Sequence, residues 1–278
     1  MKEKIGVFAF FLFISLIVSG CQSSDSPPKQ TKPGKNEVVE SHGRLENFQR
    51  LDQFVENVQN NKNDKVRLTR YTIEGDPIYH DLDYDGAKLT LTYDTTKDKF
   101  GQGEVTTTDC KSIEKQESET ETKYLLSGCS ASQMGELIAI SHNVDQEDYF
   151  AFELKYGVDK KNVINTKEQK LVKDLQNGET MAVSDFQFTK QESNQIYKHM
   201  VFSNFREEKK LSTKCNQKPH ESFELTIWIN EGSRHFEWTE CDKGRDGKEM
   251  TKLVEDIFTV LKDNPTYQAL PAAKGHYE

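Results

Sequence analysis

The carboxylates of Asp81, Asp83 and Asp85 occur at every second position and are followed by Gly86. This D-x-D-x-D-G order is how a Ca²⁺-binding loop of the EF-hand type begins, with carboxylate oxygens holding a hard cation. Such a loop needs a bidentate Glu at its twelfth position, where this chain has Thr92. A β-hairpin with acidic residues on its wet face and Asp85-Gly86 at its turn explains the same pattern, and we favour it. The three aspartates stay as candidate ligands of a divalent cation.

Histidine and serine residues form no recognisable catalytic or zinc-binding pattern. The chain has no H-E-x-x-H pair, no G-x-S-x-G elbow, no P-loop and no dinucleotide-binding glycine pattern. We therefore expect no catalytic residues and no cofactor. The alternative is a hydrolase that uses carboxylates such as Asp81 and Asp83, which would require environments that shift their pKa values.

The first of five cysteines, Cys21, ends the stretch Val18-Ser19-Gly20-Cys21, which follows an apolar run that starts at Ile5. That run has the length of a signal-peptide core, and it is shorter than the roughly 20 apolar residues of a membrane-spanning helix. The pattern resembles the precursors of bacterial lipoproteins, in which the cysteine thiol is diacylated and the chain is then cut before it. We expect a signal peptide over residues 1–20 and a palmitate-type lipid on Cys21. A transmembrane anchor with an incidental cysteine is the alternative.

The other four cysteines are an even set, which in an exported protein indicates disulfides. Three pairings are possible, and proximity along the chain favours Cys110–Cys129 and Cys215–Cys241. Each would stabilise the fold by about 3 kcal/mol in the chain-entropy model. A metal site made of four cysteines is the rival, but it needs closely spaced C-x₂₋₄-C pairs that this chain lacks.

The chain has 278 residues and a net charge of −9, with 30% charged and 34% apolar residues. Removal of residues 1–20 takes away Lys2, Glu3 and Lys4, a net +1, and leaves about −10. An acidic body argues against nucleic-acid binding, which needs a basic surface. It also argues against electrostatic docking on anionic lipid, so the lipid on the cysteine would have to hold the protein at the membrane.

The first part of the chain predicts a disordered lipid-proximal linker over residues 21–41 and then a helix and several strands. Apolar residues at helical spacing predict an amphipathic helix over residues 44–59. Alternating patterns predict strands over residues 66–74, 78–84, 88–93, 106–110 and 122–127. A charged loop is expected over residues 114–121.

The second part predicts strands over residues 149–156, 182–188, 223–229 and 234–239. Thr189 and Glu192 match a capping box at the start of a helix, and residues 250–261 form the best amphipathic pattern in the chain. Trp228 falls on the face opposite the apolar residues of its strand, where it either marks a binding surface or is covered by residues 162–175 or the last helix.

Four stretches carry a resemblance to a known family. They are Thr69–Pro77, Asp81–Gly86, Thr92–Asp94 and Lys99–Gly101. Together they resemble a domain-of-unknown-function family found in lipoproteins of Bacillus-type Gram-positive bacteria, over about residues 38–101. The resemblance implies a cell-surface location and an N-terminal domain, and it implies no activity.

We therefore expect an α+β protein with two small units, residues 42–142 and 143–278, each an antiparallel sheet packed with one or two amphipathic helices. The expected function is a lipoprotein held by its lipid at the extracytoplasmic face of the cell membrane. It would be a non-catalytic binding module that contacts a protein or envelope partner through a sheet face or edge. An extracytoplasmic carboxylate-dependent hydrolase, or a divalent-cation-binding protein, is the alternative.

Overall fold

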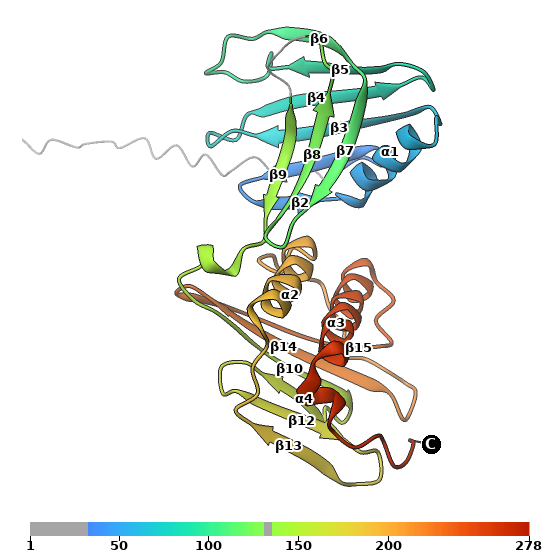
Figure 1. Cartoon of the computed structure of the whole chain (residues 1–278), viewed down its shortest axis with the longest axis vertical. Coiled ribbons are helices and arrows are strands. Elements are labelled where there is room, and N and C mark those ends of the chain that lie inside the picture. The colour runs from blue at the N-terminus through green and yellow to red at the C-terminus, as the bar shows by residue number, and fades with distance from the viewer. Residues whose placement is uncertain (1–32, 131–134, 278) are drawn as a thin grey trace, which may run out of the picture. The chain divides into compact units, whose positions relative to one another are not determined.

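Three β-sheets and four α-helices make up the part of the chain that the computed structural model describes, residues 33–130 and 135–277 (Figure 1). The predicted signal peptide, residues 1–20, and the predicted lipidation site, Cys21, lie outside the described residues. The fold is of the predicted α+β class, and most of its strand pairs are antiparallel.

The first sheet has six strands in the order β2-β1-β3-β4-β5-β6. Its strands are β1 (Glu37–Ser41), β2 (Arg44–Glu46), β3 (Asp64–Tyr71), β4 (Pro77–Tyr84), β5 (Leu89–Asp94) and β6 (Val105–Cys110). All neighbours are antiparallel except β1 and β3, which run parallel. The predicted hairpin at Asp85-Gly86 is confirmed, and Gly86 adopts a φ of 98°, which suits a residue without a Cβ.

Strand β1 corrects the last part of the disordered linker expected over residues 21–41, and residues 21–32 of that linker lie outside the described residues. Val38 is completely buried in the sheet, and residues Glu37–Glu40 pair with β3. The side chain of Asn47 donates a hydrogen bond of 2.8 Å to the carbonyl of Glu37, which fixes the start of the strand. The polar composition of the preceding spacer concealed the short apolar pair Val38-Val39.

Helix α1 (Gln49–Gln59) starts later than the predicted helix over residues 44–59. Leu45 continues the helical spacing of the apolar residues but belongs to β2, where it pairs with Glu40. Asn47 then takes a left-handed φ of 58°, which interrupts any helix. Residues that the local spacing assigned to the helix therefore form a strand of the first sheet.

The second sheet has three strands in the order β7-β8-β9, namely β7 (Ser112–Glu117), β8 (Glu121–Ser127) and β9 (Glu136–Ser141). The predicted loop over residues 114–121 is wrong for its first part, because β7 pairs with β8 along its length. The predicted disulfide Cys110–Cys129 is present. It connects the end of β6 in the first sheet to the segment that follows β8, so it links the two sheets.

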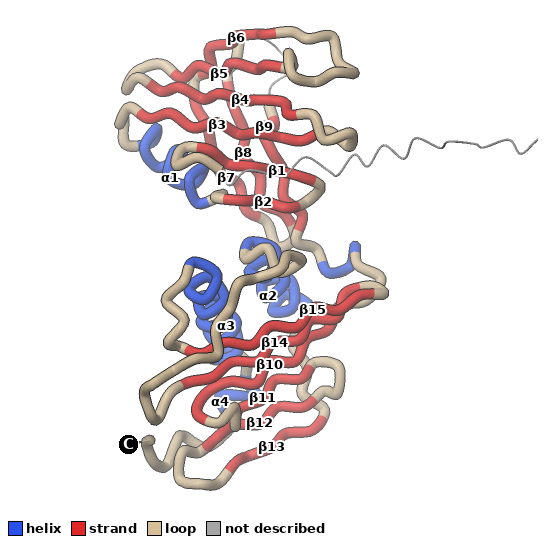
Figure 2. The backbone as a smooth tube through the Cα atoms, turned by 180° about the vertical axis from the view of Figure 1, so that it is seen from behind, coloured by secondary structure: helices blue, strands red, loops and turns tan. Residues whose placement is uncertain are grey.

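The third sheet has six antiparallel strands in the order β13-β12-β11-β10-β14-β15 (Figure 2). Its strands are β10 (Phe150–Val158), β11 (Asn162–Asn165), β12 (Lys170–Asp174), β13 (Thr180–Ser184), β14 (Glu221–Ile229) and β15 (Gly232–Thr239). A 3₁₀ turn (Val144–Gln146) precedes β10. The predicted disulfide Cys215–Cys241 is present and joins the segment before β14 to the end of β15.

Three helices pack against the third sheet. They are α2 (Lys190–Phe202), α3 (Arg245–Asp263) and the short α4 (Pro265–Gln268). The predicted capping box is confirmed, because the Thr189 hydroxyl accepts from the Glu192 N–H and the Glu192 carboxylate accepts from the Thr189 N–H. The same carboxylate accepts hydrogen bonds of 3.1 Å from the side-chain amide of Asn264, at the end of α3. Glu192 thus ties the start of α2 to the end of α3.

Two hydrophobic clusters form the interior of residues 33–278, which make up one compact unit. One cluster joins α1 to the first two sheets, and its last buried member is Ile140. The other joins α2 and α3 to the third sheet, and its first buried member is Phe152. The predicted boundary between residues 142 and 143 lies between these clusters, and independent folding of the two parts remains a prediction.

The burial of β1 predicts that Val38→Ala destabilises the protein. Removing two methyl groups from a fully buried site should lower the free energy of unfolding by about 2 kcal/mol. Urea unfolding measured by circular dichroism checks this. Val105→Ala is the matched control, because Val105 is 59% exposed on the same sheet. Equal, small effects of both substitutions would contradict a structural role for β1.

Candidate functional site

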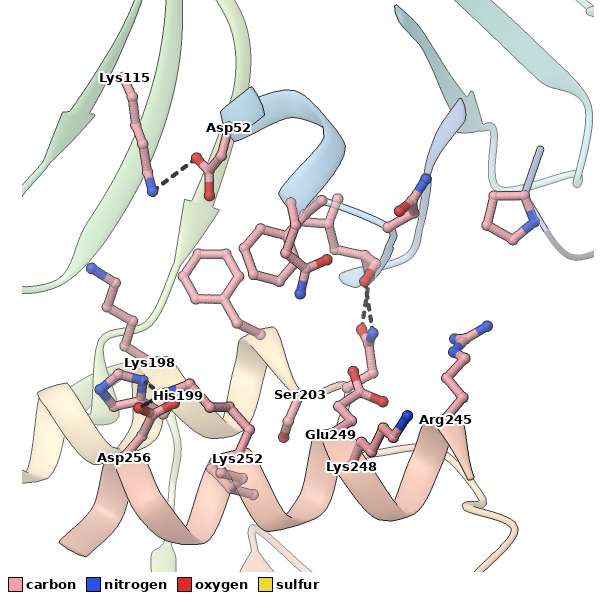
Figure 3. A pocket seen from close by; sticks show the side chains of 18 of the residues that line it. Asp52, Lys115, Lys198, His199, Ser203, Arg245, Lys248, Glu249, Lys252 and Asp256 are labelled. Carbon is pink, nitrogen blue, oxygen red and sulfur yellow. Dashed lines mark hydrogen bonds and ion pairs between the residues drawn. The ribbon is translucent and has the colours of Figure 1, made fainter. Parts of the chain in front are cut away.

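A cleft of about 810 Å³ lies between α1 and β7 on one side and α2 and α3 on the other (Figure 3). We call it the α2–α3 cleft. Its walls come from the loop before α1, from β7, from the C-terminal half of α2 and from the first three turns of α3. Its size suits a small molecule or a short segment of a polymer.

Positive side chains outnumber negative ones around the cleft. Four carboxylates line it, those of Asp52, Glu117, Glu249 and Asp256. The six Lys and Arg residues that line it are Lys35, Lys115, Lys198, Arg245, Lys248 and Lys252. Because the whole chain carries a net charge of −9, this local excess of cations contrasts with the rest of the protein.

Two lysines on one side of the cleft share a carboxylate. Lys115 Nζ lies 2.8 Å from Glu117 and 2.9 Å from Asp52, and Lys198 Nζ lies 2.9 Å from Glu117. The hydrogen bond from Lys115 lowers the pKa of Glu117 to about 2, with burial opposing the shift and Lys198 adding to it. Glu117 therefore stays ionised and holds both ammonium groups in place.

The floor of the cleft is apolar where α1 meets α2. The rings of Phe48 and Phe202 stack with their centroids 4.4 Å apart. Beside them, the side chain of Asn204 accepts from the N–H of Leu45 at 3.1 Å and donates to its carbonyl at 2.7 Å. A ligand in this cleft would therefore meet both cations and apolar surface.

His199 on α2 faces Asp256 on α3, with 3.5 Å between Nδ1 and a carboxylate oxygen (Figure 3). Burial lowers the pKa of His199, and the carboxylate of Asp256 opposes that shift. Asp256 also pairs with Lys252. Ser203 lies one helical turn beyond His199, but its hydroxyl donates to the carbonyl of Met200 at 2.8 Å. The hydroxyl is thus engaged with its own helix, and it does not complete a nucleophile–base pair with His199.

The candidate metal ligands Asp81, Asp83 and Asp85 are not brought together as a cation site. Asp81 forms a bidentate pair with Arg67 at 2.6 and 2.7 Å, and Asp83 pairs with Lys65. Asp85 accepts backbone hydrogen bonds within the hairpin turn, which lower its pKa. Across residues 33–130 and 135–277, no group of three or more His, Cys, Asp or Glu side chains is placed to hold a metal ion.

Trp228 lies on the wet face of the third sheet, as its position in the strand predicts. Lys167, from the turn between β11 and β12, places its ammonium 4.6 Å from the centre of the Trp228 ring. On the opposite face, Trp238 is completely buried and donates to Thr251 on α3 at 3.0 Å. The expected cover over Trp228 from residues 162–175 is therefore present in part, through Lys167.

None of the cleft residues was predicted as a site from the sequence. One signal was available, because Arg245, Lys248 and Lys252 follow a spacing that shares one helix face, although the predicted helix began only at residue 250 and α3 begins at Arg245. A basic row on one helix is ambiguous by itself. It gained significance only when the fold placed α1, β7 and α2 opposite.

Residues 35–125 match the family described as a domain of unknown function, DUF4362. The chain therefore contains a DUF4362 domain, which includes the α1 and β7 side of the cleft and does not include α2 or α3. No curated protein and no solved structure matches the chain. None of the helices in the described residues is both long enough and apolar enough to cross a membrane.

The pKa of Glu117 predicts a pH-dependent contribution to stability. Its folded pKa of about 2 lies below the ordinary 4.5, so the stabilisation is complete above pH 4.5 and is lost as the pH falls towards 2. Glu117→Gln should be less stable than the wild type at pH 7, and the difference should shrink between pH 4.5 and pH 2. Urea unfolding of both proteins at pH 7, 4 and 3 checks this, and a difference independent of pH would contradict it.

Proposed function

We propose that this protein is a lipid-anchored binding protein of the bacterial cell envelope, held at the extracytoplasmic face of the cell membrane, and that its α2–α3 cleft binds an anionic ligand with an apolar part. The observation that carries the binding role is the excess of cations around a cleft in an otherwise acidic protein. The sequence pattern ending at Cys21 supports the anchor.

The arrangement of charges in the cleft supports an anionic ligand. Lys115 and Lys198 are neutralised by Glu117 together with Asp52, and Lys252 is paired with Asp256. Lys248 is exposed and has no ion pair among the described contacts, while Arg245 lies 3.9 Å from Glu46. The first two turns of α3 therefore offer positive charge to a ligand, and these turns also hold the N-terminal end of the helix dipole.

The apolar floor supports a ligand that is more than a bare anion. Phe48 and Phe202 expose part of their stacked rings where Leu45 and Leu253 also line the cleft. Sites for small ligands combine such apolar walls with a few charged groups that fix orientation. Phosphate- or carboxylate-bearing amphiphiles and polymers of the envelope have this chemistry.

The alternative of a carboxylate-dependent hydrolase has less support. The side chains of Asp81 and Asp83 are 39% and 46% exposed, and each is paired with a cation. Catalytic carboxylates usually need burial or a like-charged neighbour to acquire a useful pKa. The same ion pairs compete with a divalent cation for these carboxylates.

The proposed binding role predicts that charge reversal at Lys248 weakens the binding of an anionic probe. Hexyl phosphate combines one phosphate with a short apolar chain, and it should bind the full-length protein in neutral detergent with a measurable heat of binding. Lys248→Glu should raise its dissociation constant by about tenfold, because an attractive charge becomes a repulsive one. Isothermal titration calorimetry makes the measurement.

Lys97→Glu is the control for this substitution, because it makes the same change in charge at an exposed loop residue outside the cleft. Hexyl glucoside controls for the apolar chain. The proposal is wrong if hexyl phosphate does not bind the wild type, or if both charge reversals weaken it equally.

The proposed anchor predicts the mass of the protein extracted from its native membrane. The mature chain should begin at a diacylated Cys21, and its other four cysteines should react with an alkylating agent only after reduction, because both disulfides are formed. Cys21→Ser should lose the acyl groups and retain residues 1–20. Intact-mass spectrometry checks both proteins, and an unlipidated wild-type precursor would rule out the anchor.

A further inference from the structure

Strand β13 (Thr180–Ser184) is an edge strand of the third sheet, and no strand among residues 33–130 and 135–277 pairs with its outer side (Figure 2). All of its residues except Val183 are exposed, and the large side chain of Met181 is 39% exposed. Its sequence, TMAVS, contains no charged residue and no proline. Charged residues and prolines are what usually prevents an edge strand from pairing with another chain, and β13 has neither.

Other edge strands of the described sheets do carry such residues. Charged residues occur in β2 (Arg44, Glu46), in β6 (Asp109), in β7 (Glu114, Lys115, Glu117), in β15 (Arg234, Glu237) and, at its first position only, in β9 (Glu136). On β6 and β15 the outer side is also occupied, because the Asp109 carbonyl accepts from Ser130 and the Thr239 N–H donates to Ser212. Strand β13 is thus unusually open.

The hydrogen-bond pattern shows which main-chain groups of β13 face outward. Leu175 donates its N–H to the Glu179 carbonyl, whereas Asp174 donates its N–H to Asn162 on the side of β11. Main-chain groups alternate in direction along β12, and its register with β13 is known. The N–H and C=O groups of Met181 and Val183 therefore point towards β12. The N–H and C=O groups of Thr180, Ala182 and Ser184 consequently face away from the sheet.

We propose that β13 is a homodimer interface, at which two copies of this chain pair their β13 strands antiparallel about a two-fold axis at Ala182. The two third sheets then continue into each other through main-chain hydrogen bonds. Only an extended polypeptide can satisfy a row of alternating N–H and C=O groups at this spacing.

The sequence of β13 identifies a second copy as that polypeptide. Pairing about Ala182 places Thr180 opposite Ser184 of the other copy, so hydroxyls face hydroxyls. Met181 and Val183 of the two copies also become opposite neighbours, on the face where Val183 packs against the core of the third sheet. Ala182 faces itself. Each cross-strand pair therefore joins residues of one kind, which is how paired strands are stabilised.

Charge at the ends of β13 opposes this pairing in part. The strand itself brings no charges together, but Glu179 before it lies opposite Asp185 of the other copy at each end. Glu179 is paired with Lys274 at 3.0 Å, and that ammonium group offsets the repulsion. A two-fold axis makes the contact closed and self-complementary, so it gives a dimer and no longer assembly.

Cysteine cross-linking of the full-length protein in its native membrane tests the proposal. In Ala182→Cys the two introduced thiols face each other across the axis, where opposite Cα atoms lie roughly 5.5 Å apart, within the range of a disulfide. Mild oxidation should yield a reducible dimer. Ser184→Cys is the matched control, because each Ser184 lies opposite Thr180 and its own copy is four residues away, about 13 Å.

A dimer from Ala182→Cys and none from Ser184→Cys is the expected result. The proposal is overturned if Ala182→Cys stays monomeric, if both variants cross-link equally, or if Ala182→Cys joins only to a protein of another mass, which would assign the edge to a different partner.

Sedimentation of the full-length protein in neutral detergent supplies a second measurement. Ala182→Pro removes an outward-facing N–H that the fold does not use, which an edge strand tolerates. Because one hydrogen bond is lost in each direction across the axis, the dimer dissociation constant should rise by about thirtyfold. The circular dichroism spectrum should be unchanged. A wild type that remains monomeric at every concentration, or a Pro variant that dimerises as well as the wild type, overturns the proposal.

Discussion

The side chain of Asn204 holds the main chain of Leu45 by both of its polar groups, and the stacked rings of Phe48 and Phe202 lie beside this contact. These contacts hold Leu45 and the start of α1 against the end of α2, and the two rings form the floor of the cleft. The amide of Asn204 suits this task because it donates and accepts at once, as a neighbouring strand does. Beside them, the ion pair of Lys198 with Glu117 and the hydrogen bond from Asn194 to Glu119 join α2 to the β7–β8 hairpin.

Electrostatics in this protein are local. Most charges on the wet faces of the sheets occur in pairs, such as Arg67 with Asp81, and these pairs cancel within a few ångströms. The first turns of α3 differ, because Lys248 has no ion pair among the described contacts and Arg245 shares Glu46, 3.9 Å away, with Arg44. A protein with a large negative net charge thereby keeps one concave, positive surface, and net charge alone would never have indicated it.

Sequence periodicity predicted the helices and strands whose own residues determine their secondary structure. The amphipathic pattern located α3, the capping box located the start of α2, and alternation located most strands. Periodicity did not predict strands whose secondary structure depends on pairing with a neighbouring strand. Strands β1 and β7 are short and carry few apolar residues, and they form where β3 and β8 offer hydrogen bonds beside them. The cleft could not be predicted from the sequence for a related reason: its residues come from four elements that only the tertiary structure brings together.

The carboxylate of Glu192 is shared between two helix ends, since it completes the capping box of α2 and also receives the amide of Asn264 after α3. Lys248 lies sixteen residues before Asn264 along the same helix, a distance of roughly 24 Å. The Glu192–Asn264 contact therefore helps to set the direction of α3 at the end far from its basic turns. A substitution that tilted the helix at this contact would displace Lys248 by more than it displaces Asn264, because displacement grows with distance along the axis.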